Sequence, residues 1–281
     1  MNALKSGIFF IHGKAFEECD WHVTRLSLNF NLDDRQVYRT PSRAYTISPE
    51  KYLLLNEGQS FKTLANSCSP NRMVTIAFQV GLADKLLQGL NTVEKQLLDE
   101  PFKTPEGKVN FLEKTYLLDL ALRNSVDKLT ALEDEVRVDE ALEELLLELV
   151  RRQLGVRKEI ISIKKSRMST RLEVYRRLHW SLEHLAENFA SDITVEDLAR
   201  VACLSTFHYK RLFAEVFTLS PYQYLIKLRL EKACTLLKEG GKVSDICRQV
   251  GWKDPSSFTR LFRRQFSVSP DQYRYGISRQ K

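Results

Sequence analysis

The chain has 281 residues, 43% of them hydrophobic, and a formal net charge of +7. This length suggests roughly two domains, and no stretch approaches the roughly 20 apolar residues that a membrane-spanning helix needs. The apolar run at residues 8–11 is too short for the core of a signal peptide. The odd number of cysteines, five, argues against a disulfide framework, and the sequence has neither a Cys-x-x-Cys pair nor the Cys/His spacing of a zinc site. We therefore expect a cytoplasmic protein that has no membrane partner.

Charge is distributed unevenly along the chain. Residues 1–150 hold 17 Lys and Arg against 23 Asp and Glu, a net of −6. Residues 151–168 carry a net of +6, and residues 169–281 a net of +7. An acidic part joined to a basic part suggests that only the second part meets a polyanion, although a basic face is often merely solvated. The charge distribution alone therefore does not establish binding to a polyanion, and a sequence motif is needed as well.

The first 80 or so residues have the pattern of short β-strands. Apolar or alternating segments are separated by turn-forming pieces such as residues 31–34 and 48–50. The predicted strands are residues 7–12, 25–30, 35–39, 52–56 and 73–78. Many short strands with frequent turns are typical of an antiparallel barrel or sandwich.

From about residue 83 to residue 155 the apolar period becomes helical. Residues 110–124 and 140–154 are predicted to be amphipathic helices. They either cover the β-domain or pair with a second copy of the chain, and the sequence leaves both possibilities open. Residues 156–170 are basic with little core pattern and are predicted to be a linker. The expected domains are therefore residues 1–155 and residues 171–281.

The helical C-terminal part contains an internal repeat. Residues 211–224 align with residues 260–273 at an offset of 49, and eight of the fourteen positions are identical. Upstream, residues 197–200 match residues 245–248 at an offset of 48. The one-residue slip falls in the segment between these matches, where a turn is predicted.

Each copy has the pattern of a helix-turn-helix unit. Thr194 or Ser244 can cap the first helix, and Gly251 can adopt the left-handed backbone that ends a helix. The second helix begins after the turn and ends before a Ser-Pro pair. Its predicted core residues are Tyr209, Leu212, Phe213 and Phe217 in the first copy, and Phe258, Leu261, Phe262 and Phe266 in the second. A helix, a short turn and a second helix form the motif whose second helix enters the DNA major groove.

The outward face of each second helix follows from its inward face. The candidate DNA-binding residues on these faces are Thr206, Phe207, Lys210 and Arg211 in the first copy, and Ser256, Thr259 and Arg260 in the second. Arginine suits a bidentate contact with guanine, and an exposed phenylalanine suits contact with a thymine methyl group. The alternative is that Phe207 enters the core or that Arg211 pairs with a nearby acid. The helix predicted at residues 222–237 spans roughly 24 Å, which brings the two readers close to one DNA turn, about 34 Å, apart.

Residues 171–275 resemble the AraC/XylS family of bacterial transcription regulators. The likeness is carried by Leu198-Ala199, Arg211-Leu212-Phe213, Ser220-Pro221, Val250-Gly251-Trp252, Phe258-Thr259-Arg260 and Ser269-Pro270. The sequence departs from the family pattern at Thr218 and Ser267, where glycine is usual, at Trp252, where phenylalanine is usual, and at Ser269, where threonine is usual. The resemblance implies a two-lobed DNA-binding domain that binds double-stranded DNA, and RNA polymerase as a partner if the protein is an activator.

The N-terminal region more loosely resembles the family's companion domain, through the strand-and-turn piece at residues 52–58. The resemblance implies an α+β protein: a cupin-like antiparallel β-barrel with helices, followed by an all-α domain whose two helix-turn-helix motifs are joined by a helix. It also implies a homodimer and a small-molecule effector whose binding residues are unknown.

Two alternatives remain open for the N-terminal region. One is a domain that only dimerises, in a ligand-independent activator. The other is a cupin-type enzyme, but His12 and His22 form no ligand cluster. We expect no catalytic residue, no metal site and no cofactor.

Overall fold

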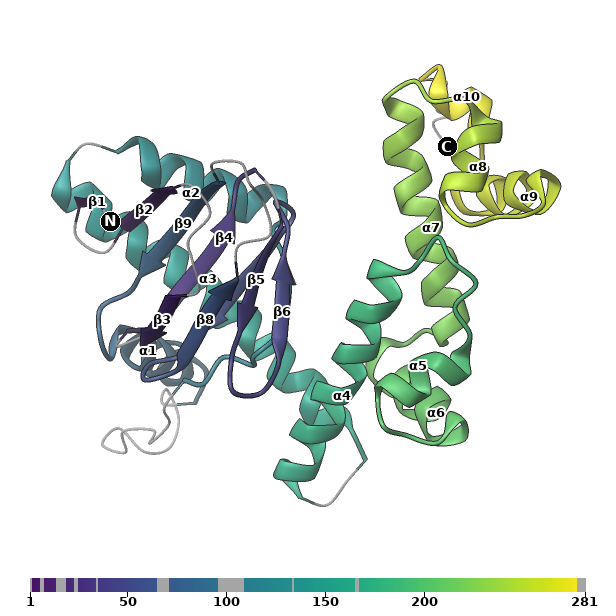
Figure 1. Ribbon diagram of the computed structural model, residues 1–281. Coiled ribbons are helices and arrows are strands. Elements are labelled where there is room, and N and C mark those ends of the chain that lie inside the picture. Colours follow the sequence, from purple (N-terminus) through teal and green to yellow (C-terminus); the bar gives the residue numbers. More distant parts are fainter. Residues whose placement is uncertain are drawn as a thin grey trace. The chain divides into compact units, whose positions relative to one another are not determined.

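The computed structural model (Figure 1) contains two compact units, Met1–Lys158 and Glu159–Lys281. It describes residues 2–5, 8–13, 19–22, 25–33, 35–64, 71–95, 109–132, 134–164 and 167–276. The first unit holds antiparallel sheets with helices, and the second is helical, which confirms the predicted mixed α+β class. Within the described residues, no helix is both long and apolar enough to cross a membrane.

The strands of the first unit form two antiparallel sheets. The six-stranded sheet has the order β1 (Asn2–Lys5), β2 (Ile8–Gly13), β9 (Asn71–Ala77), β4 (Ser27–Asn31), β7 (Lys51–Leu55) and β10 (Thr115–Leu117). The four-stranded sheet has the order β3 (Cys19–His22), β8 (Ser60–Leu64), β5 (Gln36–Arg39) and β6 (Ala44–Ile47). All five predicted strands are present, as β2, β4, β5, β7 and β9. Among the described residues, no strand pairing joins the two sheets into one closed barrel.

Strand β7 is buried on both faces and separates two cores. Tyr52 and Leu54 pack in the core that the larger sheet shares with helices α1 (Leu82–Lys95), α2 (Leu120–Ala131) and α3 (Glu135–Ser162). Leu53 and Leu55 point the other way, into a core between the two sheets. That second core also contains the fully buried rings of Tyr38 and Tyr45. The helices therefore cover one face of the larger sheet, and the smaller sheet covers the other.

The helix predicted at residues 110–124 is wrong over its first ten residues. This stretch holds strand β10, which pairs with β7, and only then α2 begins. Asn56 exchanges two hydrogen bonds with the backbone of Phe111, at 2.8 and 2.9 Å, and Tyr116 stacks on Tyr52 with ring centroids 5.1 Å apart. Asp119 caps α2 by accepting a hydrogen bond from the backbone N–H of Leu122. These contacts with residues distant in sequence outweigh the local helical pattern.

Most of the basic stretch at residues 156–170 lies in helices. Helix α3 continues to Ser162, and α4 (Met168–Glu187) begins six residues later. Val156, Ile160 and Ile163 are buried. The domain limits at residues 155 and 171 stay a prediction, but the intervening stretch is mostly helical and has buried apolar side chains.

The second unit contains seven described helices. After α4 come α5 (Val195–Val201), α6 (Thr206–Phe217), α7 (Pro221–Lys238), α8 (Val243–Gln249), α9 (Pro255–Phe266) and α10 (Pro270–Arg274). The pairs α5–α6 and α8–α9 are the two copies of the repeat, and α7 joins them (Figure 1). Thr194 caps α5 as predicted, but Ser244 does not cap α8, which begins after Lys242 and has no side-chain cap.

The two copies end their second helices in the same way. Thr218 and Ser267 follow α6 and α9 in the left-handed conformation, with φ of 58° and 60°. These are the positions where the resembled family usually has glycine. A residue with a side chain is strained there, and hydrogen bonds from the Thr218 and Ser267 backbone N–H groups to the last helical turn close each helix. The fold thus keeps the family's helix ending without its glycine.

Candidate nucleic-acid interface

Side-chain caps fix the start of each second helix. Ser205 caps α6 by accepting a hydrogen bond from the backbone N–H of His208. Asp254 caps α9 by accepting from the backbone N–H groups of Ser256 and Ser257, at 3.0 and 2.9 Å. Hydrogen bonds from Ser257 hold the pKa of the Asp254 carboxyl below its usual value of 3.8. The carboxylate is therefore charged at neutral pH, where it stabilises the helix N-terminus.

Buried aromatic rings fix the rotation of both helices about their axes. Tyr209 and Phe213 of α6 and Phe258 and Phe262 of α9 are completely buried. The hydroxyl of Ser181 in α4 also lies 3.1 Å from the Tyr209 hydroxyl. Leu212 is buried as predicted, whereas Leu261 and the rings of Phe217 and Phe266 are only half-buried. Because these rings fix which side of each helix is buried, they also determine which side chains lie on its outer face.

The outer face of α6 carries the four predicted residues near its start. Phe207 is 74% exposed, so it does not enter the core. Lys210 and Arg211 are exposed, and Thr206 is half-buried. Among the described residues, no carboxylate lies within ion-pair distance of Arg211. These side chains are therefore available to a partner.

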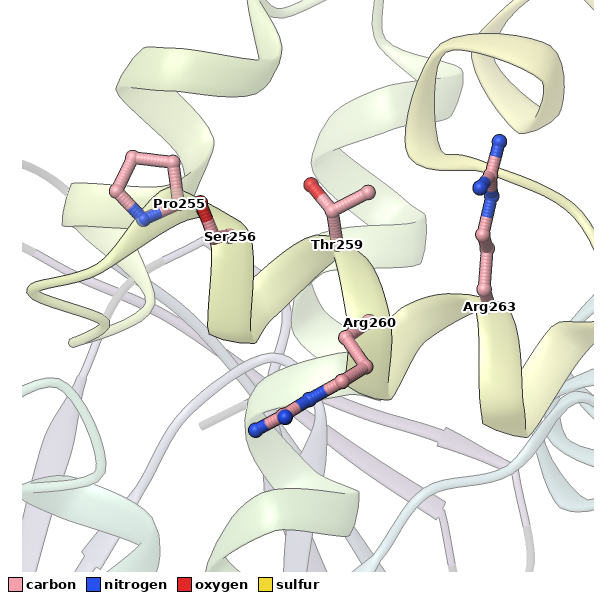
Figure 2. Close-up of a pocket in the computed structure, with 5 residues that line it drawn as sticks. All are labelled: Pro255, Ser256, Thr259, Arg260 and Arg263. Atoms are coloured by element: carbon pink, nitrogen blue, oxygen red, sulfur yellow. The ribbon is translucent and has the colours of Figure 1, made fainter.

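The outer face of α9 borders an open pocket of about 520 Å³ (Figure 2). It is lined by Pro255, Ser256, Thr259, Arg260 and Arg263. In Figure 2 the side chains of Thr259 and Arg263 point to one side of the helix, whereas Arg260 points to the other. All three predicted residues of this copy nevertheless line this one pocket.

Arg263 is a member of this surface that the sequence analysis missed. It lies four residues after Thr259, so it falls on the same helical face one turn later. The repeat hid it, because the corresponding position in α6 is Ala214. The next pair differs too: Arg264 corresponds to Glu215, which accepts a hydrogen bond from the backbone N–H of Lys164 at 2.6 Å. Helix α9 therefore carries three arginines and no acid, whereas α6 has one acid among its cations.

This surface supplies donors and cations rather than a catalytic constellation. Arginine and lysine can bond guanine or phosphate oxygens, and hydroxyls can bond bases or phosphates. Within the described residues, no group of three or more His, Cys, Asp or Glu could hold a metal ion. The chemistry on these faces is that of recognition of a polyanion.

Two capped helices, each the second member of a repeated helix-turn-helix unit, define a DNA-binding domain with two recognition helices. A family model described as a helix-turn-helix domain matches residues 198–275. The C-terminal unit thus contains an AraC-type helix-turn-helix domain, in agreement with the family resemblance of residues 171–275.

Two curated relatives are named as transcription activators. A lactose operon transcription activator of Staphylococcus xylosus is 35% identical over 35% of this chain and 36% of its own length. The transcriptional activator RhaS of an Enterobacter species is 34% identical over 46% of this chain and 47% of its own length. The chain therefore spans less than half the length of these two curated relatives.

Two solved structures are also similar to this chain. ToxT from Vibrio cholerae, in a form with bound unsaturated fatty acid, has a TM-score of 0.38 and 14% identity, covering 97% of both chains. The DNA-binding domain of AdpA, solved with a target DNA, has a TM-score of 0.35 and 29% identity, covering 36% of this chain and 91% of that one.

Proposed function

We propose that this chain is a transcription regulator that binds a specific, asymmetric DNA site, with α6 and α9 entering successive major grooves. The observation that carries the proposal is the pair of capped recognition helices whose outer faces present exposed basic side chains beside hydroxyl groups and the exposed ring of Phe207. Thr206, Phe207, Lys210 and Arg211 would contact one half of the site. Ser256, Thr259, Arg260 and Arg263 would contact the other half.

The unequal copies support an asymmetric site. Phe207 and Lys210 of α6 correspond to Ser256 and Thr259 of α9, so the two helices present different chemistry. Arg211 and Arg260 are the shared element. Each half would thus contain a guanine contacted by arginine, beside positions that differ between the halves.

A pair of double variants of the full chain tests this function. Binding is measured with a duplex selected from a random library and with random duplex, at several salt concentrations. Replacing Arg211 and Arg260 with alanine is expected to remove most of the preference for the selected duplex. The matched control replaces Arg200 and Arg248, exposed residues at equivalent places in α5 and α8 that pair with Asp197 and Asp245. The control loses the same charge and should keep the preference.

Two outcomes would contradict the proposal. One is a full chain that shows no preference for any duplex over random DNA. The other is an equal loss of preference in both double variants, which would assign recognition to general charge rather than to the second helices. Mapping the bound sites in the cell would then identify the regulated genes.

For the N-terminal unit we propose a cupin-like domain that binds a small-molecule effector and forms a homodimer, in a cytoplasmic protein. Its separate hydrophobic core, which contains none of the proposed DNA contacts, supports a regulatory role. The names of the two activator relatives favour positive regulation, for which RNA polymerase would be the partner. Sedimentation of the full chain tests dimerisation directly, and a monomer at micromolar concentration would contradict it.

A further inference from the structure

The loop between α4 and α5, residues 188–194, belongs to the first helix-turn-helix lobe but also contacts the second. Phe189 packs against the core cluster that contains Trp252, Phe258 and Phe262 of the second lobe. One half-buried aromatic residue of the first lobe's loop thus packs against the core of the second lobe. The two lobes therefore share a contact in addition to helix α7.

Arg229 of α7 holds this loop in place through hydrogen bonds to its backbone. Its Nε donates a hydrogen bond to the backbone carbonyl of Phe189 at 2.6 Å, and its Nη2 donates to the carbonyl of Ser191 at 2.9 Å. The guanidinium carbon also lies 5.7 Å from the ring centroid of Trp252. The rigid fork of an arginine can hold two carbonyls at once, which the single ammonium of lysine does less well. Arg229 therefore links α7, the loop and the second lobe's turn.

Gly251 allows the turn of the second lobe to approach this loop closely. A Cβ at this position would lie 2.6 Å from the carbonyl oxygen of Ala190, closer than atoms of a real side chain come. Gly251 also has a φ of 84°, which favours glycine. The neighbouring Lys253 pairs with Asp192 at 2.6 Å, but the two side chains are 81% and 75% exposed, so this pair contributes little. The close contact depends on packing and on Arg229.

The close contact at Gly251 has no counterpart at the equivalent position of the first copy of the repeat. In the first lobe, Cys203 occupies the position of Gly251 with the same left-handed backbone, at a φ of 51°, and is exposed. The turn of the first lobe thus has the same backbone shape, yet its side chain faces solvent. Only the second turn requires glycine for close approach, which indicates that the contact serves to join the lobes.

We infer that Arg229, Phe189 and Gly251 form a brace that fixes the orientation of α9 relative to α6, and so sets the spacing of half-sites that the chain accepts. Without further contacts the two lobes would be joined by helix α7 alone, and a long helix can bend along its length. A second point of attachment removes that freedom. The inference rests on the proposed function, because spacing has meaning only if both helices read DNA. Arg229 is a positioning residue and touches no base.

The test measures how strongly the full chain resists a changed spacing. Its selected duplex is compared with the same duplex carrying one extra base pair between the half-sites. That insertion shifts one half-site by about 3.4 Å and rotates it by about a tenth of a turn. A braced chain must give up the base contacts of one helix, so we expect the wild-type affinity to fall on the order of 30-fold.

Two variants at position 229 and one matched control separate the brace from general effects. For Arg229→Met we expect the insertion to cost roughly 3-fold instead, because the released second lobe can follow its half-site. Base preferences within each half-site should stay the same. Lys227→Met removes the same charge from the same helix and should keep the wild-type penalty. Among the described residues, Lys227 forms one ion pair, with Glu231 at 3.9 Å. Arg229→Lys retains the charge, and it carries the test if thermal unfolding shows that Arg229→Met is not folded.

Each outcome decides the inference. A smaller insertion penalty at position 229 with an unchanged penalty for Lys227→Met supports the brace. A folded variant at position 229 that keeps the full penalty overturns it, as does a wild-type chain that is indifferent to the insertion. The proposed function survives both of these results, because specific binding is still observed. A chain that binds no duplex specifically would overturn the function and the brace together.

Discussion

Replacing Arg260 with alanine tests whether the second recognition helix reads bases. Arg260 is exposed and lines the pocket along α9. Among the described residues it makes no hydrogen bond or ion pair, and a substitution at such a surface site changes stability by about 0.5 kcal/mol or less. Any larger loss of DNA affinity would therefore report on the complex and not on the fold.

The expected size of the effect follows from the contact that arginine makes. A bidentate bond to guanine is worth about 1–3 kcal/mol, so the affinity for the selected site should fall about 5- to 150-fold. The loss should be confined to one base pair of the site, where all four bases become nearly equivalent. The salt dependence should change little, because a base contact releases few counterions.

The assay is the affinity of wild-type and variant chains for every single base-pair change in the selected site. Arg264→Ala is the control, because this substitution removes the same charge from the same helix at a residue that does not line the pocket. It should leave every base preference intact. A flat loss of affinity in Arg260→Ala, with all base preferences retained, would refute the base-reading role and assign Arg260 to phosphate.

Three further predictions follow from the same geometry. Replacing a contacted thymine by deoxyuridine should lower the DNA affinity of the wild-type chain but not that of Phe207→Ala. Equal losses of affinity in both chains would contradict the contact between Phe207 and the thymine methyl group. Gly251→Ala should lower the midpoint of thermal unfolding more than Gly240→Ala, since both have positive φ but only Gly251 faces Ala190; equal shifts would argue against the contact. The pKa of Asp254 is lowered by hydrogen bonding, so its stabilising effect is present above its unfolded pKa of 3.8 and is lost as pH falls below that value. The stability gap between wild type and Asp254→Asn should therefore shrink in acid, and a gap that is constant from pH 6 to pH 2 would oppose the assigned cap.

The sequence was most informative where the repeat compares two copies of one unit. Matching aromatic positions such as Phe213 and Phe262 predicted the inner faces, and the outer faces followed from them. The helix caps Ser205 and Asp254 were missed because the one-residue slip between the copies falls at that turn. Arg263 was missed because its counterpart in the first copy is an alanine.

Contacts between distant residues were beyond the sequence. Strand β10 forms because Tyr116 can stack on Tyr52, and nothing in the local pattern of residues 110–119 signals that partner. The Arg229 contact with Phe189 joins residues 40 positions apart through backbone carbonyls, which carry no sequence signal. Local periodicity predicts which face of a helix is buried, but not which loop will pack against it.

The most direct test of the central claim is a base-resolution footprint of the full chain on a duplex selected from a random library. The account predicts, for each bound chain, two protected major-groove segments of different sequence about one helical turn apart, and binding that weakens steeply as salt rises. One protected segment per chain, or two segments of identical sequence, would contradict the claim that α6 and α9 both read DNA and read it differently.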